Sequence, residues 1–160
     1  MRILVTGASG FIGAVLCSQL VERGHEVGAL VRRAGSEPSG TRGLTGDLGD
    51  GPGLNRIIAD ERPDCVIHLA AEIASQRSER KIREVNVRGT ARLLDACLAL
   101  GGSTPGAGPR IVFSSTVVTG DARGAILTED TPLPVETPYG RSKQEGEQLV
   151  LAAGLSLIHI

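Results

Sequence analysis

The sequence of 160 residues predicts one doubly wound α/β domain, with helices on both faces of a parallel β-sheet. Three observations support this prediction. Short apolar, β-branched runs alternate with longer segments of helical periodicity, which is typical of repeated β-α units. A glycine-rich segment, GASGFIG, lies between the first apolar run and the first helical segment. A hydrophobic content of 41% with 22% charged residues is ordinary for a single domain with its own core.

The first part of the chain predicts a complete β-α-β unit. Strands are expected at residues 2–6 and 26–31 because both runs are short, apolar and rich in β-branched residues. The segment between them has helical spacing of its apolar residues, which we expect on one face: Phe11, Ile12, Val15, Leu16 and Leu20. Gly24 is expected to end this helix, because glycine adopts the left-handed backbone of a C-terminal cap at little cost.

The rest of the chain predicts three more strands and two more helices. The strands are expected near residues 42–45, 65–69 and 110–114. One helix is expected from Lys81 to Leu100, and it carries the apolar residues Val85, Leu93, Leu94, Cys97 and Leu98. The last helix is expected from Pro138 to Ala153, since proline is favoured in a first turn. A doubly wound sheet of these strands has the order 3-2-1-4-5, with a possible sixth strand.

Composition excludes several classes of function. A net charge of -1 and an aromatic content of 2% disfavour nucleic-acid binding. The three cysteines, Cys17, Cys65 and Cys97, are widely separated and have apolar neighbours, so we interpret them as core residues in a reducing compartment and expect no metal site. No segment has the length of a membrane span or the pattern of a signal peptide. We therefore expect a cytoplasmic protein with no membrane partner.

Two local patterns have chemical meaning. Gly7, Gly10 and Gly13 follow the first strand with GxxGxxG spacing, which lets backbone N–H groups and the positive end of a helix approach a pyrophosphate. This predicts dinucleotide binding, with a tight turn that binds nothing as the alternative. Tyr139 and Lys143 are four residues apart on the last helix and share a face. Such pairs are also common on helix surfaces, so the spacing alone leaves the role of Tyr139 open.

Six short motifs together carry a family resemblance that covers nearly the whole chain. They are TGASGFIG (6–13), GDL (46–48), HLAA (68–71), NVRGT (86–90), SSTVVTG (114–120) and YGRSK (139–143). Their order and separation resemble the extended short-chain dehydrogenase/reductase superfamily, and in particular the NAD-dependent epimerase/dehydratase family. The resemblance implies a Rossmann-type NAD(P)-binding fold. It also implies an oxidoreductase, epimerase or dehydratase that acts on a hydroxyl or carbonyl carbon of a small-molecule substrate, such as a sugar or nucleotide sugar.

The resemblance implies that Ser115, Tyr139 and Lys143 form a catalytic trio. Ser115 would orient the hydroxyl or carbonyl of the substrate, and Tyr139 would exchange the hydroxyl proton as a hydride moves to or from the nicotinamide. A tyrosine ordinarily titrates at about pH 10, so its phenolate needs a positive charge nearby. Lys143, together with the nicotinamide ring, would supply that charge.

The resemblance also implies the residues that hold the cofactor. Asp47 would hydrogen-bond the adenine, and the small residues Ala70 and Ala71 would keep the crevice at the strand ends open. His68 is interpreted as a core residue, and Asn86 as a support beneath the active site. The expected cofactor-binding residues are Gly7, Ser9, Gly10, Phe11, Ile12, Gly13, Arg32, Arg33, Asp47, Leu48, Leu69, Ala70, Ala71 and Lys143.

Two departures from the family pattern affect substrate and cofactor. Members usually have V-Y-G after the serine pair, whereas residues 118–120 here are VTG, so no substrate is assigned by analogy. Many NAD-using members have an acidic residue at the end of the second strand, whereas this chain has Val31, Arg32 and Arg33. Guanidinium groups bind a 2′-phosphate, so NADP is favoured over NAD; the alternative is that both arginines only solvate a loop.

Two other functions stay open at this point. One is the NADPH-dependent reduction of a small ketone, aldehyde or sugar acid, which the two arginines favour. The other is a dinucleotide-binding sensor without catalysis, which Ser115, Tyr139 and Lys143 disfavour. The resemblance further suggests a homodimer built from the helices at 81–100 and 138–153.

The end of the sequence carries an expectation about domain organisation. Family members continue with a substrate-binding region, so residues 1–154 are expected to be an NAD(P)-binding domain truncated before it. Residues 155–160, LSLIHI, match the translation of a transposon-end adapter used in sequencing libraries. We hypothesise that these six residues are read-through from such an adapter, and we expect low activity from the chain in isolation.

Overall fold

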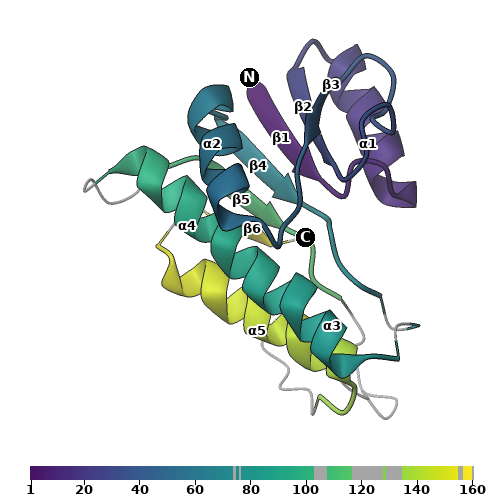
Figure 1. The fold of residues 1–160 in the computed structure, drawn as a ribbon, viewed down its shortest axis with the longest axis vertical. Helices are drawn as coiled ribbons and strands as arrows, with labels where there is room; N and C mark the ends of the chain where they lie inside the picture. The colour runs from purple at the N-terminus through teal and green to yellow at the C-terminus, as the bar shows by residue number, and fades with distance from the viewer. Residues whose placement is uncertain are drawn as a thin grey trace.

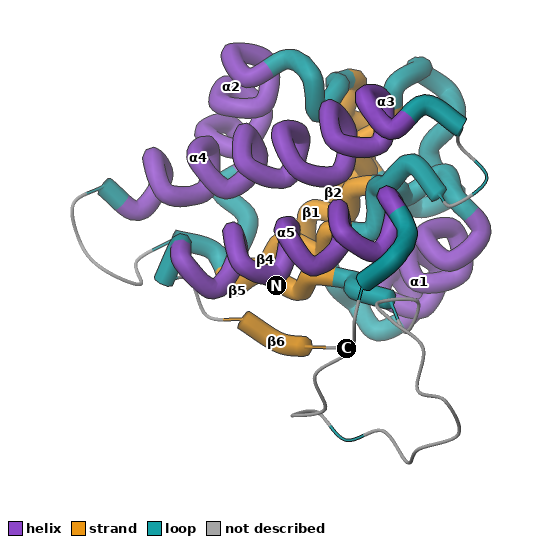
Figure 2. The backbone as a smooth tube through the Cα atoms, turned by 90° about the horizontal axis from the view of Figure 1, so that it is seen from below, coloured by secondary structure: helices purple, strands orange, loops and turns teal. Residues whose placement is uncertain are grey.

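The computed structural model describes residues 1–73, 75, 77–102, 108–116, 128, 135–154 and 157–159. Six parallel strands form one sheet in the order β3-β2-β1-β4-β5-β6 (Figure 1). The strands are β1 (Arg2–Thr6), β2 (Glu26–Val31), β3 (Arg42–Thr45), β4 (Cys65–His68), β5 (Arg110–Phe113) and β6 (Leu157–His159). The predicted order 3-2-1-4-5 is confirmed, and β6 extends the sheet at the edge beside β5 (Figure 2).

Helices cover both faces of the sheet. On one face lies α1 (Phe11–Glu22); on the other lie α2 (Gly51–Glu61), α4 (Thr90–Gly101) and α5 (Pro138–Ala152) (Figure 1). The short helix α3 (Glu79–Arg83) and the π-helical segment η1 (Glu84–Gly89) lead directly into α4. The helix predicted from Lys81 to Leu100 is therefore one helical segment with a π-helical middle, a local widening that is frequent near functional sites.

The sheet separates two hydrophobic cores. Side chains alternate along each strand, so Leu4 packs with Leu93 beneath α2, α4 and α5, while Val5 packs with Cys17 beneath α1. The three cysteines are buried, as predicted. Leu98 of α4 is 40% exposed, whereas Leu93 and Leu94 of the same helix are buried.

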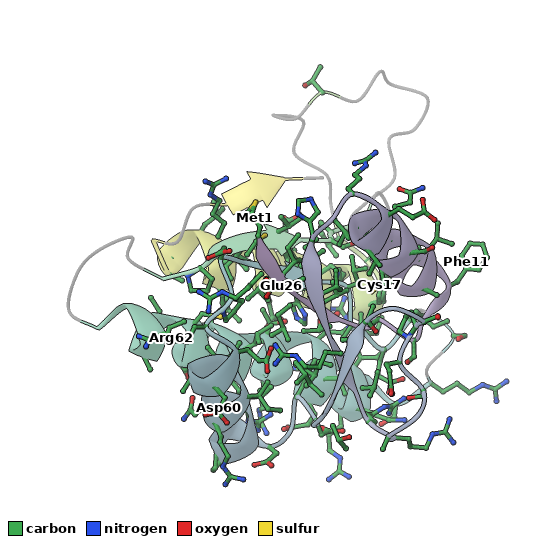
Figure 3. All side chains as sticks on the ribbon, turned by 90° about the horizontal axis from the view of Figure 1, so that it is seen from above. Met1, Phe11, Cys17, Glu26, Asp60 and Arg62 are labelled. Carbon is green, nitrogen blue, oxygen red and sulfur yellow. The ribbon has the colours of Figure 1, made fainter. Side chains whose placement is uncertain are left out.

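The predicted apolar face of α1 was also wrong in part. Leu20 is buried and Leu16 packs against the core, but Phe11, Ile12 and Val15 are 92%, 64% and 55% exposed. Figure 3 shows Phe11 pointing away from the body of the molecule. The helix instead buries small residues, Gly13 and Cys17, because they let it lie close to the sheet and to the loop before it.

Helix α2 is missing from the sequence prediction. Its start contains Gly51, Pro52 and Gly53, which obscured a helical pattern carried by the buried residues Leu54 and Ile58. The sequence did carry a signal for the start of this helix, because aspartate is a favoured N-cap residue and proline a favoured first-turn residue. In the structure, the Asp50 side chain accepts a hydrogen bond from the Gly53 N–H, and Pro52 lies in the first turn.

Candidate functional site

A cavity of about 480 Å³ lies at the carboxyl ends of the strands. Residues after β1, β2, β3, β4 and β5 line it, which is where doubly wound folds bind ligands. Its volume is in the range of small-molecule and cofactor sites. All of the expected cofactor-binding residues line this cavity except Arg33 and Lys143.

Several lining residues were not among those expected. They are Thr6, Leu30, Val31, Gly46, Glu72, Ile73, Val85 and Ser114. Most of them directly precede or follow an expected residue at the end of a strand, so the predicted strand ends were the signal that could have identified them. Val85 is different, because it comes from η1 and only tertiary packing brings it to the cavity.

The glycine-rich loop is packed so closely that side chains are excluded. A Cβ atom at Gly13 would lie 2.2 Å from the carbonyl oxygen of Gly7, so only glycine lets α1 approach the loop. Gly7 has a φ of 71°, and a Cβ there would lie 2.7 Å from the Ala70 nitrogen. The first loop therefore lies against the segment that follows β4, and both line the cavity.

The amino end of α1 lacks a side-chain cap. Its N-cap is Gly10, whereas side chains cap α2 (Asp50), α3 (Ser78) and α5 (Thr137). An uncapped amino end leaves backbone N–H groups available, and the helix dipole makes that end attractive to an anion. Because the end also opens on the cavity, these residues fit a pyrophosphate.

Asp47 lies in the cavity wall and also shapes its own turn. Its Oδ1 accepts a hydrogen bond from the Gly49 N–H at 2.7 Å. The carbonyl of the next residue, Leu48, accepts a hydrogen bond from Arg92 of α4 at 3.4 Å. These two hydrogen bonds fix the turn at residues 47–49, and the Asp47 carboxylate lies in this turn, directly after β3.

The three expected catalytic residues lie around the carboxyl end of β5 and the start of α5. The Ser115 Oγ is buried and has no hydrogen-bond partner among the described residues. Lys143 is 4% exposed, and its Nζ lies 4.3 Å from the centre of the Phe113 ring, two residues before Ser115. Tyr139 is half-buried in the first turn of α5. None of the three lines the cavity, although Ser114 does. Residues 118–120 lie outside the described residues.

Asn86 joins three elements beneath this region. Its side-chain amide donates hydrogen bonds to the Glu72 carbonyl and to the Ser142 Oγ, and its Oδ1 accepts one from the Glu72 N–H. Ser142 in turn donates to the Tyr139 carbonyl at 2.7 Å. The supporting position expected for Asn86 agrees with these contacts, which connect η1, the segment after β4 and the first turn of α5.

A directed chain of hydrogen bonds runs through His68, as expected for a core residue. Thr90 Oγ1 donates to the Asn86 carbonyl, so it accepts from the His68 Nε2–H at 2.9 Å. Thr6 Oγ1 accepts from the Ala70 N–H and can therefore donate to the His68 Nδ1, at 2.6 Å. These contacts place a proton on Nε2. Burial, together with the charge of Lys143, lowers the pKa of His68 to about 3.

Comparison with known proteins identifies the family. The sequence model of the NAD dependent epimerase/dehydratase family matches residues 3–157. The chain belongs to this family. Among relatives, the UDP-glucose 4-epimerase of Azospirillum brasilense is 33% identical over 96% of the chain and 44% of its own length. The 2-alkyl-3-oxoalkanoate reductase of Stenotrophomonas maltophilia is 35% identical over 96% of the chain and 46% of its own length. The chain spans about half the length of the curated relatives it matches.

Solved structures agree with this membership of the epimerase/dehydratase family. The UDP-glucose 4-epimerase of Thermus thermophilus, in complex with NAD, superimposes with a TM-score of 0.85 at 32% identity. The match covers 99% of this chain and 54% of that protein. The Rossmann-type fold is thereby established for this chain, and the family to which it belongs is NAD dependent. Among the described residues, no helix is both long enough and apolar enough to span a membrane.

Proposed function

We propose that this family member is an NAD(P)-dependent oxidoreductase, epimerase or dehydratase acting on a hydroxyl or carbonyl carbon of a sugar or nucleotide sugar. The observation that carries the proposal is the cavity itself, where an uncapped helix end and a tightly packed glycine loop meet at the carboxyl ends of the strands. Relatives that are UDP-glucose 4-epimerases support a nucleotide sugar as substrate.

The residues of the chain have distinct roles in this proposal. Ser115, whose hydroxyl has no partner among the described residues, donates a hydrogen bond to the substrate oxygen. Tyr139 removes the proton from the substrate hydroxyl, or returns it, as the carbon is oxidised or reduced. Lys143 stabilises the Tyr139 phenolate by its positive charge. When bound, the nicotinamide ring accepts or returns the hydride.

Dinucleotide binding is the first test of the proposal. We expect titration of the chain with NAD, NADP and their reduced forms to give saturable heat by calorimetry. Binding of none of the four would reject the proposed function. Transfer of deuterium from a labelled reduced dinucleotide to the carbonyl carbon of a keto nucleotide sugar would separate an enzyme from a dinucleotide-binding sensor.

Gly13→Ala should weaken dinucleotide binding. The added methyl would lie 2.2 Å from a backbone carbonyl, so α1 must move away from the loop. Such overpacking costs about 1–3 kcal/mol, which corresponds to roughly 5- to 150-fold in affinity if it falls on the bound state. Gly51→Ala is the control, because a Cβ there meets no atom closer than 3.8 Å. If Gly13→Ala left the dinucleotide affinity unchanged, the close packing of α1 against the glycine-rich loop would not be needed for dinucleotide binding.

We propose further that the cavity prefers NADP to NAD. Arg32 supports this preference, because it lines the cavity at the end of β2, where it can bind a 2′-phosphate. Arg33 is exposed and does not line the cavity, so we assign it no part in cofactor binding. The solved epimerase of Thermus thermophilus holds NAD, so this relative does not support a preference for NADP. The proposed preference for NADP therefore depends on Arg32 alone.

Arg32→Asp should weaken NADPH binding about tenfold or more and leave NADH within about twofold, because a carboxylate repels the 2′-phosphate. Arg33→Asp is the matched control and should change both affinities little. Calorimetric titration of both variants with both reduced dinucleotides provides the measurement. An equal effect of Arg32→Asp on NADH and NADPH would contradict the preference.

A simple reductase is the second candidate. Arg32 in the cavity favours it, since net reductions usually draw on NADPH, and one relative is a 2-alkyl-3-oxoalkanoate reductase. Net oxidation of NADPH by a small ketone, aldehyde or sugar acid, with none by a nucleotide sugar, would favour the reductase. A homodimer formed by residues 81–100 and 138–153 stays a prediction.

A further inference from the structure

Lys143 is a buried cation. It is 4% exposed, and burial lowers its pKa to about 8. Among the described residues, no carboxylate forms an ion pair with it, whereas its neighbours on α5, Arg141 and Glu145, pair with residues of α3. A buried ammonium ordinarily needs a partner that replaces its lost hydration. The contact available to it is the face of an aromatic ring.

That ring belongs to Phe113, the last residue of β5. The Lys143 Nζ lies 4.3 Å from the ring centre, which is within the range of cation–π attraction. The negative face of the ring stabilises the ammonium and not the neutral amine. The contact therefore opposes the effect of burial on the protonation of Lys143.

The surroundings hold the Phe113 ring in this position. Gly146 lies one turn after Lys143 on α5, and a Cβ there would lie 2.7 Å from the Phe113 Cζ. The absence of a side chain at residue 146 thus makes room for the ring. On another side the His68 ring lies 5.7 Å away, tilted by 44°. Phe113 is itself 4% exposed, so it has little freedom to turn away.

Two titratable groups face Lys143 from the elements packed around it, and one of them is charged. From α5, Glu147 raises the pKa of Lys143 by its negative charge. From β4, His68 stays neutral because burial lowers its pKa to about 3, so it adds no repulsion. Phe113 of β5 makes the direct contact, and its attraction adds to that of Glu147.

We propose that Phe113, which precedes Ser115 by two residues, is a positioning residue for Lys143. The face of its ring keeps the Lys143 ammonium charged and in place at the carboxyl end of β5. Its benefit to the reaction rests on the proposed function, in which the charge of Lys143 stabilises the Tyr139 phenolate. The electrostatic contact itself exists without any ligand.

The composition of the chain permits a clean test. It contains only two lysines, Lys81 and Lys143, and two phenylalanines, Phe11 and Phe113. With ¹³Cε-labelled lysine, NMR follows two titrations, one exposed and one buried. Mono-, di- and trifluorinated phenylalanine placed at residue 113 draws negative charge from the ring face while nearly preserving its shape. We expect the titration midpoint of Lys143 to fall with each fluorine, by about 0.4 to 1.5 in pH over the series.

Three comparisons make the outcome decisive. The same analogues at Phe11, which is 92% exposed, should leave Lys143 unchanged, and Lys81 provides an internal reference. Phe113→Leu, which stays apolar but has no ring, should lower the midpoint in the same direction. The proposal would be overturned if the titration midpoint of Lys143 changed neither with fluorination of residue 113 nor with Phe113→Leu. Because the titration is done without dinucleotide, that result is distinct from a failure of dinucleotide binding, which would overturn the proposed function instead.

Discussion

In the full-length protein, Tyr139→Phe is expected to lower turnover by roughly 10²- to 10⁴-fold, the usual contribution of a positioned general acid or base. The substitution removes the phenol oxygen and keeps the ring, so dinucleotide affinity should stay within about twofold. The measurement is the rate of hydride transfer with saturating dinucleotide and UDP-glucose, followed by the ultraviolet absorbance of the reduced nicotinamide. Tyr139 is the only tyrosine of the chain, so no second phenol can replace it.

Gln144→Ala is the matched control for this substitution. Gln144 is exposed on the same helix, one residue after Lys143, and should tolerate alanine with little change in rate. Turnover by Tyr139→Phe at the rate of the unsubstituted protein would reject Tyr139 as the acid–base residue. A loss of dinucleotide affinity equal to the loss of turnover would instead indicate a structural role.

His68 should make the folded protein sensitive to acid. Its pKa is about 3 in the folded chain against 6.5 in an unfolded one, so between these values the unfolded state binds a proton that the folded state does not. The stabilising effect of a neutral His68 is complete above pH 6.5 and is lost as the pH falls toward 3. The full difference corresponds to a loss on the order of 5 kcal/mol in the free energy of unfolding.

Urea unfolding at a series of pH values measures this loss. His68→Asn removes the titrating ring while an amide oxygen can still accept from Thr6, so its unfolding free energy should vary less steeply below pH 6.5. His25→Asn is the control, because it removes the imidazole of another of the three histidines. It shows whether a change in acid dependence is specific to residue 68 or follows from the loss of any histidine. A His68→Asn variant with the same acid dependence as the unsubstituted chain would contradict the prediction.

Much of the fold was predictable because its signals are local. The strand positions follow from short β-branched runs, and the end of α1 follows from Gly24, whose φ of 79° is the left-handed value expected. The same locality explains the errors. Apolar spacing placed Phe11 on the same helix face as Leu20, but Phe11 is exposed, and the depth at which α1 packs is decided by Gly13 against the Gly7 carbonyl. Helix α2 was missed because its first residues are poor helix formers that only a cap and core contacts stabilise.

The candidate site divides in the same way. The sequence by itself determined the glycine loop, the strand ends that line the cavity and the residues available for chemistry. Tertiary structure alone decided that Arg32 and not Arg33 lines the cavity, and that Phe113 lies under Lys143. It also joined Thr6, His68 and Thr90 in one hydrogen-bond chain. These contacts connect residues up to 62 positions apart in the sequence, and local spacing carries no information about which distant side chains share a volume.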